Sequence, residues 1–468
     1  MVLGRTSELK YLNTCYDREG SQIMVVYGEK NVGKTALLDE FVQDKPHSYY
    51  CARPASEREQ RYRWGMELWP EAFTAPGYPA FGEIFQSIAG EETSAVSDGT
   101  PVLKGRAEKK VIIVDEFQYI VKAGNAFMDE LIAFVHNSWQ NTQVMVVLCS
   151  SSIGWVENSM ITRIGEAAYE ISGFLKIKEL SFETMMEFFP GFSMEQCVEA
   201  YAVLGGIPGL WMHFNDKIGI RENICKYILD KNAFLNREGQ RIMEEELRET
   251  GVYNTILASI AAGKHKLNEL YLHTGFSRAK ISVYLKNLME LELVEKIFSY
   301  DTEGKANTQK GIYRIKNHFV HFYFTYLYPN LSGLEQLPAD AFYKKQIAPY
   351  FKSYVAEYFK TVCKQHVEKL NKWGRLPIEI DRMGEWAGKL GNIDVIAQDA
   401  EGKTIIGVCN WEKNIMSYAD YEWLLFCAEK AKIRADYIYL FSVKRFDEKL
   451  NLEAKMKQNL KLISMDEM

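Results

Sequence analysis

The sequence predicts an α/β protein of several domains, and three observations support this fold class. An apolar run at 23–27 leads through a glycine-bearing loop into an amphipathic helix, and a second apolar run at 111–114 ends in two acidic residues. The last third combines a long helical pattern at 350–370 with several short strand-like runs. Continuous apolar runs that lead into helices are typical of parallel strands covered on both faces. At 468 residues the chain is too long for one core, and domains of roughly 150 residues are expected.

The composition excludes several classes of protein. The chain is 47% hydrophobic and 25% charged, and no apolar run reaches the roughly 18 residues of a membrane span. Its start, MVLGRTSELK, lacks the apolar core of a signal peptide, so we expect a cytoplasmic protein without a membrane partner. The 8 cysteines are scattered singly, which predicts reduced thiols rather than a disulfide framework or a zinc site. A net charge of −6 argues against a surface coated for non-specific nucleic-acid binding, but a local basic face stays open.

Residues 28–35, GEKNVGKT, fit the phosphate-binding pattern G-x-x-x-x-G-K-[ST] between a strand and a helix. Gly28 and Gly33 let backbone N–H groups turn towards phosphate oxygens, and the helix that follows points its positive end at them. Lys34 adds a full charge over the β- and γ-phosphates, and Thr35 is expected to bind Mg²⁺ through its hydroxyl. The other predicted nucleotide contacts in this segment are Asn31, Val32 and Ala36.

A pair of carboxylates follows the apolar run VIIV. Asp115 at the carboxyl end of this predicted strand is placed to hold Mg²⁺, and Glu116 to orient and polarise the attacking water. An isolated Asp-Glu pair is a weak signal. Together with an upstream phosphate loop it predicts the acidic half of an ATP-hydrolysing site.

Two further positions are candidates for contact with the γ-phosphate. The apolar run 143–149 ends in serines, and Ser150 or Ser151, with Ser151 preferred, could sense the phosphate from the tip of a strand beside the phosphate loop. A helix N-cap or turn role is the alternative for these serines. Arg163 could act as an arginine finger towards a neighbouring subunit, and a solvated surface arginine is the alternative.

At this point a family resemblance becomes visible. The segments LGRTSEL, VIIVDEF, LCSSS, LKIKELSFETMMEFFP and YAVLGGIPGLW, together with the phosphate loop, occur in an order that resembles the archaeal and bacterial P-loop ATPase family of the AAA+/STAND type. The resemblance extends over nearly the whole chain. It implies that Gly4 and Arg5 lie against the adenine, although Thr6 departs from the acidic residue usual next in the family. It also implies that the G-G-x-P segment 205–208 opens a lid helix over the nucleotide, which makes Pro208 a candidate contact.

Residues 253–315 predict a winged helix-turn-helix. Three short apolar stripes at helical spacing precede two strand-like runs, 293–300 and 311–315, which flank a polar loop. The third helix begins after a good N-cap, Ser277. It places four polar side chains away from its apolar stripe, where they could contact the phosphates and base edges of double-stranded DNA: Arg278, Lys280, Ser282 and Lys286. The alternative is a protein-docking or lid module with a solvated face.

The C-terminal order of helix, three strands, helix and strand resembles a PD-(D/E)XK nuclease-like domain. In that fold two carboxylates on adjacent strands hold a metal ion, and a lysine on the same strand face helps to activate water. Glu357 and Asp394 match the family pattern, but Val408 stands in place of its glutamate and Asn410 in place of its lysine. We therefore expect a fold without nuclease activity. Strand alternation leaves one alternative, a displaced carboxylate from Glu412 on the face of Val408 and Asn410.

The predicted organisation is a P-loop ATPase domain at 1–180, a helical lid at 181–246, a winged helix-turn-helix at 247–318 and a degenerate nuclease-like domain at 319–468. The predicted function is an ATP-binding and ATP-hydrolysing switch with ATP and Mg²⁺ as cofactors. The alternatives are a DNA-binding regulator with structural ATP and an ATP-gated, metal-dependent nuclease. A protein partner or a homo-oligomer stays open.

Overall fold

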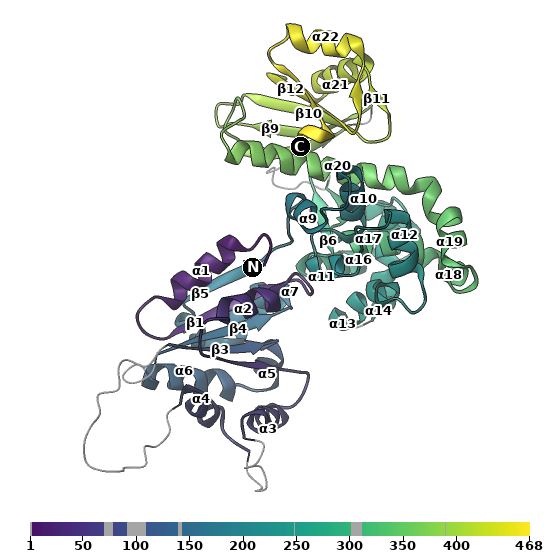
Figure 1. The fold of residues 1–468 in the computed structure, drawn as a ribbon. Coiled ribbons are helices and arrows are strands. Elements are labelled where there is room, and N and C mark those ends of the chain that lie inside the picture. The colour runs from purple at the N-terminus through teal and green to yellow at the C-terminus, as the bar shows by residue number, and fades with distance from the viewer. Residues whose placement is uncertain are drawn as a thin grey trace, which may run out of the picture. The chain divides into compact units, whose positions relative to one another are not determined.

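A computed structural model of the chain describes residues 2–69, 78–90, 109–138, 143–247, 249–300, 311–388 and 390–468. The chain divides into two compact units, Met1–Glu179 and Leu180–Met468 (Figure 1). Each unit contains its own five-stranded sheet. Among the helices of the described ranges, none combines the length and the apolar character needed to cross a membrane.

The sheet of the first unit is parallel throughout, with strand order β2-β3-β4-β1-β5. Its strands are β1 (Gln22–Gly28), β2 (His47–Cys51), β3 (Lys110–Asp115), β4 (Val144–Ser150) and β5 (Gly173–Ile177). The central strand β4 and its neighbour β1 are apolar along almost their whole length because helices cover both faces. This arrangement confirms the predicted α/β class with a parallel sheet.

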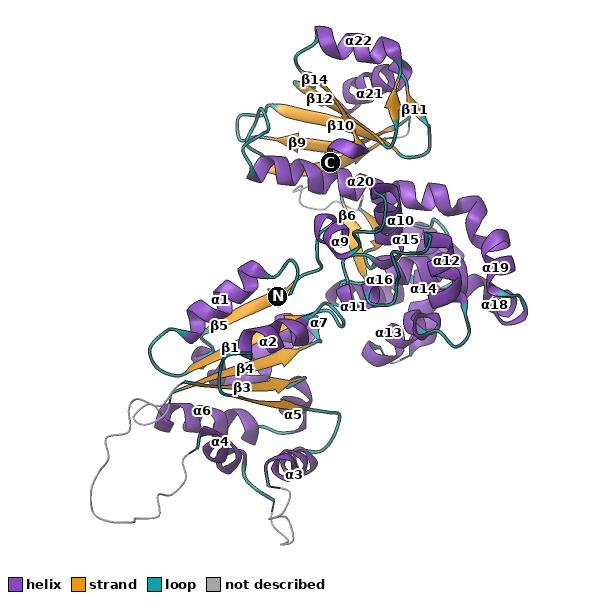
Figure 2. Ribbon diagram, in the orientation of Figure 1, coloured by secondary structure: helices purple, strands orange, loops and turns teal. Residues whose placement is uncertain are grey.

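Helices lie on both sides of this sheet (Figure 2). One face packs in a core with α3 (Glu57–Leu68), α4 (Phe81–Ala89), α5 (Gln118–Ala123) and α6 (Ala126–Ser138), where Trp64, Phe81, Phe85 and Phe127 are fully buried. Ile23 and Val25 of β1 belong to that core. Strand alternation turns Met24 and Val26 to the other face, on the side of α1 (Thr6–Tyr16) and α2 (Lys34–Val42).

The second unit begins with short helices. These are α9 (Phe182–Phe188), α10 (Met194–Leu204), α11 (Pro208–Trp211), α12 (Ile220–Ile224) and α13 (Glu238–Glu246). Helix α10 ends before Gly205, and Pro208 starts α11 at a first-turn position, where its missing N–H costs nothing. The predicted helix break and restart is therefore present. The indole Nε1 of Trp211 donates to the Gly205 carbonyl at 2.8 Å, which fixes the turn.

The predicted three helices and two strands of the winged helix are present. They are α14 (Thr250–Ala261), α15 (Leu267–Thr274), α16 (Arg278–Glu290), β6 (Val294–Ile297) and β7 (Ile312–Ile315), and the two strands pair antiparallel. The Ser277 hydroxyl accepts from the Lys280 N–H at 3.2 Å, as expected of an N-cap. Strand β6 is shorter than the predicted 293–300, and the predicted wing loop at 301–309 lies outside the described residues.

A long helix, α20 (Ala348–Lys372), precedes a mixed sheet and follows the short helices α17 (His318–Phe322), α18 (Leu331–Gln336) and α19 (Ala339–Phe342). The sheet has strand order β14-β12-β10-β9-β8. Its elements are β8 (Arg382–Ala387), β9 (Asn392–Gln398), β10 (Thr404–Asn410), α21 (Tyr418–Ala431), β12 (Tyr437–Ser442), α22 (Glu448–Met456) and β14 (Leu460–Ser464). The predicted order of elements is present, but β8 lies later than the predicted strand near 376–383.

Candidate functional site

Three strands of the first unit end at the same edge of the sheet. Gly28 ends β1, Asp115 ends β3 and Ser150 ends β4, and the strand order places β4 between the other two. The crevice outside the carboxyl ends of parallel strands is where open α/β sheets bind ligands. The phosphate loop and the acidic pair, predicted separately from the sequence, therefore meet at one edge.

The phosphate loop needs glycine at both glycine positions of its pattern, Gly28 and Gly33, for physical reasons. A Cβ built on Gly28 would lie 2.3 Å from the backbone oxygen of Ile177 on β5, so a larger residue has no room there. Gly33 has φ of 98°, which residues with a side chain rarely adopt. Asn31 also lies in the left-handed region, at φ of 63°, which asparagine tolerates better than most residues.

The start of α2 has the donors that a phosphate group requires. The first three N–H groups of this helix, on Lys34, Thr35 and Ala36, have no acceptor within the described part of the chain. The Lys34 ammonium is buried and donates to the carbonyls of Gly28 at 2.9 Å and Glu29 at 3.0 Å. Thr35 is exposed, with its hydroxyl available to a ligand. Three N–H donors, a helix N-terminus and an ammonium group fit a polyphosphate.

The N-terminal Gly-Arg pair lies beside this loop. The Arg5 guanidinium is buried, donates to the Val32 carbonyl at 2.7 Å and pairs with Glu8 at 3.1 Å. Gly4 precedes it with φ of 68°. Arg5 thus ties α1 to the phosphate loop, and its contact with adenine stays a prediction. Pro208 belongs to the other unit, so its contact with the nucleotide is likewise untested.

Asp115 has a neighbour that could not be predicted from the sequence. The hydroxyl of Tyr49, on the adjacent strand β2, donates to Asp115 Oδ2 at 2.7 Å, and the Glu116 N–H donates to Oδ1 at 2.9 Å. Burial, together with this bond to Asp115, raises the pKa of Tyr49 well above its usual range, so its hydroxyl stays protonated and donates. Both oxygens of Asp115 are therefore held by neutral donors.

Glu116 has an uncommon backbone. Its φ is 53°, in the left-handed region that glutamate rarely adopts, and such outliers cluster at functional sites. Its Oε2 accepts from the Ser151 hydroxyl at 2.8 Å and from the Ser151 N–H at 3.3 Å, and the Gln118 amide donates to the same oxygen. The predicted base and the predicted sensor serine therefore touch each other.

The two remaining candidates in this unit differ in their surroundings. Ser150 is buried, and its hydroxyl accepts from the Ser152 N–H at 3.1 Å, which is a turn role. Arg163 is exposed on α8 (Ile161–Ile164), and its Nε donates to the Val121 carbonyl at 3.1 Å. A role for Arg163 in another subunit stays a prediction.

Comparison with known proteins agrees with this geometry. Residues 3–214 match a family model described as an ATPase domain predominantly from Archaea. The chain carries an archaeal-type ATPase domain. Residues 323–422 match a second family model, described as archaeal and bacterial proteins of unknown function. An uncharacterized protein of Methanocaldococcus jannaschii, MJECL04, is 29% identical over 416 residues, which are 88% of each chain.

Two solved structures are similar to parts of this chain. The Walker-type ATPase PABY2304 of Pyrococcus abyssi has 17% identity and a TM-score of 0.45, with 69% of this chain and 96% of that chain covered. The ORC2 protein of Aeropyrum pernix, in ADPNP–ADP complexes, has 12% identity and a TM-score of 0.41, with 71% and 95% covered.

The second unit contains another pair of carboxylates, Glu357 and Asp394, and the predicted placement of the strand residues beside them needs correction. Val408 packs with the hydrophobic core beneath α21 and does not point to Asp394, which faces α20. An irregularity of register between β8 and β9 accompanies this change of face. Asn410 closes a turn by accepting from the Lys413 N–H at 2.9 Å.

Glu412 is also placed differently from the expectation. Strand β10 ends at Asn410, so Glu412 does not continue its face, and its carboxylate accepts from the Ser353 hydroxyl on α20. The proposed glutamate and lysine positions of a nuclease strand therefore do not converge on Asp394.

The segment predicted to be a winged helix carries its predicted polar residues on the surface. All four side chains of α16 singled out from the sequence are exposed: Arg278, Lys280, Ser282 and Lys286. Arg278 donates to Asn268 at 2.6 Å and lies over the Tyr271 ring, and Lys286 pairs with Glu290 at 3.7 Å. These contacts orient the side chains without burying them.

Proposed function

We propose that this protein binds ATP with Mg²⁺ and hydrolyses it slowly, as a nucleotide-dependent switch. The observation that carries the proposal is the meeting of the phosphate loop, Asp115 and Glu116 at one edge of a parallel sheet. The match to an ATPase family model over residues 3–214 supports it.

The binding residues would act as follows. Thr35 and Asp115 would hold the metal ion, which when bound would neutralise charge on the β- and γ-phosphates. Few protein ligands are the rule for Mg²⁺ at nucleotide sites, since the phosphates supply the others. Lys34 would exchange the Gly28 and Glu29 carbonyls for phosphate oxygens, and such charged hydrogen bonds are the stronger kind.

Glu116 would position the attacking water and accept its proton. Its Oε2 accepts hydrogen bonds from both Ser151 and Gln118. Exchange of one of these bonds would let the Glu116 carboxylate turn towards a water at the γ-phosphate. Ser151, which already contacts the base, would then be free to sense the phosphate, and this exchange is a physical reason to expect slow turnover.

The test is the Glu116→Gln variant, which keeps the shape of the side chain and removes its basicity. We expect nucleotide affinity within about threefold of wild type and hydrolysis at least about 100-fold slower, the usual contribution of a general base. Calorimetry measures the first and phosphate release the second. Glu166→Gln, on the exposed surface of the same unit, is the matched control. Unchanged hydrolysis in Glu116→Gln removes the assignment.

A second candidate function is DNA binding by the winged helix, favoured by the exposed polar face of α16. Phosphate contacts make affinity fall with salt, by a slope of about one per contact. A gel-shift series over salt concentration tests this, with a double Arg278→Ala, Lys280→Ala variant expected to flatten the slope by about two. The absence of a shift at low salt would exclude the candidate.

A further inference from the structure

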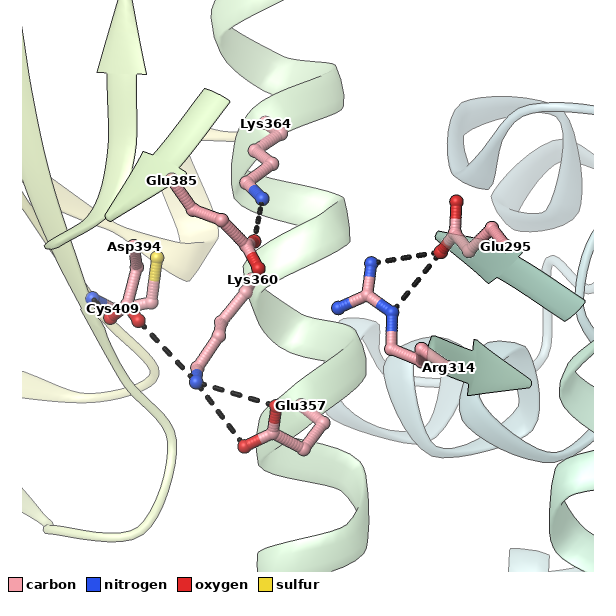
Figure 3. A network of polar contacts seen from close by, with 8 residues as sticks. All are labelled: Glu295, Arg314, Glu357, Lys360, Lys364, Glu385, Asp394 and Cys409. Carbon is pink, nitrogen blue, oxygen red and sulfur yellow. Dashed lines mark hydrogen bonds and ion pairs between the residues drawn. The ribbon is translucent and has the colours of Figure 1, made fainter. Parts of the chain in front are cut away.

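Helix α20 carries a lysine between two carboxylates. The Lys360 ammonium lies 3.2 and 3.4 Å from the oxygens of Glu357, one turn earlier on the same helix, and 3.3 Å from Asp394 Oδ1 on β9 (Figure 3). The second oxygen of Asp394 accepts from the Cys409 N–H at 3.0 Å. Both Asp394 oxygens are thus engaged, one by a full positive charge.

The surroundings hold this ammonium in its charged form. The Lys360 side chain is 23% exposed and that of Asp394 only 9%. Burial alone would lower the pKa of Lys360, but the charges of Asp394 and Glu357 outweigh it and raise the pKa above its usual range. The group is therefore a permanent cation at physiological pH.

A neighbouring ion pair repeats the arrangement. Lys364, one turn further along α20, pairs with Glu385 on β8, so two successive lysines of one helix face bind carboxylates of two adjacent strands (Figure 3). Beyond it, Arg314 of β7 binds Glu295 of β6 through Nε at 3.1 Å and Nη2 at 3.0 Å. The burial of Glu385 is offset by Lys364, which lowers the pKa of this carboxyl.

A divalent cation between Glu357 and Asp394 would have to occupy the position of the Lys360 ammonium, which already supplies positive charge to both carboxylates. Two carboxylates carry two negative charges, and a metal ion added beside the ammonium would meet like-charge repulsion at a few ångströms. Neither Val408 nor Asn410 offers a further ligand, because Val408 packs against the hydrophobic core and Asn410 closes a turn. The residues present therefore do not fit the metal ion that the nuclease resemblance implies.

We propose that Lys360 is the resident cation of this C-terminal site: its ammonium takes the place of a divalent metal ion between Glu357 and Asp394 and fastens α20 to the sheet. The domain then works without metal, as a binding or structural module.

The experiment measures Mn²⁺ binding to the full chain, without nucleotide, by electron paramagnetic resonance. Wild type should bind no Mn²⁺ at this site up to millimolar concentration, while Lys360→Ala should bind one ion with a Kd at least tenfold below that limit. The double variant Lys360→Ala, Asp394→Asn should lose that binding. Lys360→Arg, which keeps the charge, and Lys352→Ala, an exposed lysine of the same helix, should both behave as wild type.

Circular dichroism checks that each variant is folded. If Lys360→Ala is unfolded, Lys360→Gln, which keeps a long polar side chain without the charge, takes its place. A folded, uncharged variant that binds no Mn²⁺ overturns the proposal. Mn²⁺ binding by the wild type that Asp394→Asn abolishes also overturns it. Mn²⁺-dependent cleavage of DNA that Asp394→Asn abolishes would do the same. The test is made without nucleotide, so its result does not depend on whether the phosphate loop binds ATP.

Discussion

The protein has two carboxylate pairs beside parallel or mixed sheets, and they differ in what holds them. In the ATPase domain, Asp115 and Glu116 accept hydrogen bonds from neutral donors, chiefly the hydroxyls of Tyr49 and Ser151. In the C-terminal unit, Asp394 and Glu357 share the ammonium of Lys360. Neutral donors leave the negative charge uncompensated, whereas an ammonium cancels part of it.

This difference has an energetic consequence. A hydrogen bond from a hydroxyl contributes about 1 kcal/mol net, which a metal ion or phosphate can readily replace. A partly buried ion pair is harder to open, because removal of one partner leaves an unpaired charge at a cost of about 3 kcal/mol. The first pair is therefore suited to exchange its partners during a reaction, and the second is suited to hold two elements together.

The largest effect should come from Lys34→Ala. The variant removes the positive charge that the pattern places at the β- and γ-phosphates, and a lost charged contact costs about 3 kcal/mol, or roughly 100-fold in affinity. Calorimetric titration with ATP measures this loss. Lys10→Ala, an exposed lysine on α1, should titrate as wild type. Equal affinity in Lys34→Ala and wild type would contradict the assignment of residues 28–35 as the phosphate-binding loop.

The ion pair of Asp394 with Lys360 should contribute to the stability of the fold rather than to nucleotide affinity. Asp394→Ala leaves Lys360 partly buried with one carboxylate fewer, and we expect the free energy of unfolding to fall by about 2–3 kcal/mol. Urea unfolding followed by circular dichroism measures it. The exposed Glu401→Ala should change stability by less than about 0.5 kcal/mol. A similarly small change in Asp394→Ala would mean that the ammonium does not fasten α20.

Acid should destabilise the second unit more than the first. Burial lowers the pKa of His318 to about 4 and of His321 to about 3, whereas the first unit's His47 and His136 are exposed. The unfolded chain takes up these protons near pH 6.5 and the folded chain does not, so the stabilisation is complete above pH 6.5 and is lost as pH falls towards 4.

For each of these histidines the second unit should lose about 1.4 kcal/mol per pH unit within that window. Urea unfolding at pH 7.5 and 5.5 measures the slope, which should be shallower in His321→Gln and unchanged in the control His47→Gln. A wild-type slope equal to that of His321→Gln would place the acid sensitivity elsewhere.

The smallest predicted effect is a gain in affinity for ATP with Mg²⁺. Tyr49→Phe removes the hydroxyl that competes for Asp115, and since that bond is worth about 1 kcal/mol, affinity for ATP with Mg²⁺ should rise about fivefold. Affinity for ATP with EDTA should not change, because only the metal ligand is affected. The exposed Tyr169→Phe serves as control. A loss of affinity in Tyr49→Phe would instead identify Tyr49 as a support of Asp115.

The sequence predicted those parts of both regions that depend on local pattern. The phosphate loop lies in one continuous segment, and Asp115 and Glu116 end an apolar run, so spacing alone located them. The N-cap at Ser277 and the helix that carries Glu357 followed from local rules in the same way. Tyr49 could not be found, because its contact with Asp115 depends on the pairing of β2 with β3 across a long stretch of chain.

Lys360 was missed for a different reason. It lies three residues after Glu357 on one helix face, a spacing that brings side chains together, so the local pair could have been read from the sequence. The direction of Val408 could not, since the face that Asp394 presents depends on an irregularity between β8 and β9. Simple alternation of a strand fails wherever a register shift intervenes.

The most direct test of the contrast between the two carboxylate regions is the stoichiometry of Mn²⁺ on the wild-type chain, measured by electron paramagnetic resonance with and without a non-hydrolysable ATP analogue. We expect one ion per chain, bound only with the nucleotide, lost in Asp115→Asn and retained in Asp394→Asn. Two ions per chain, or one that Asp394→Asn removes, would contradict the account.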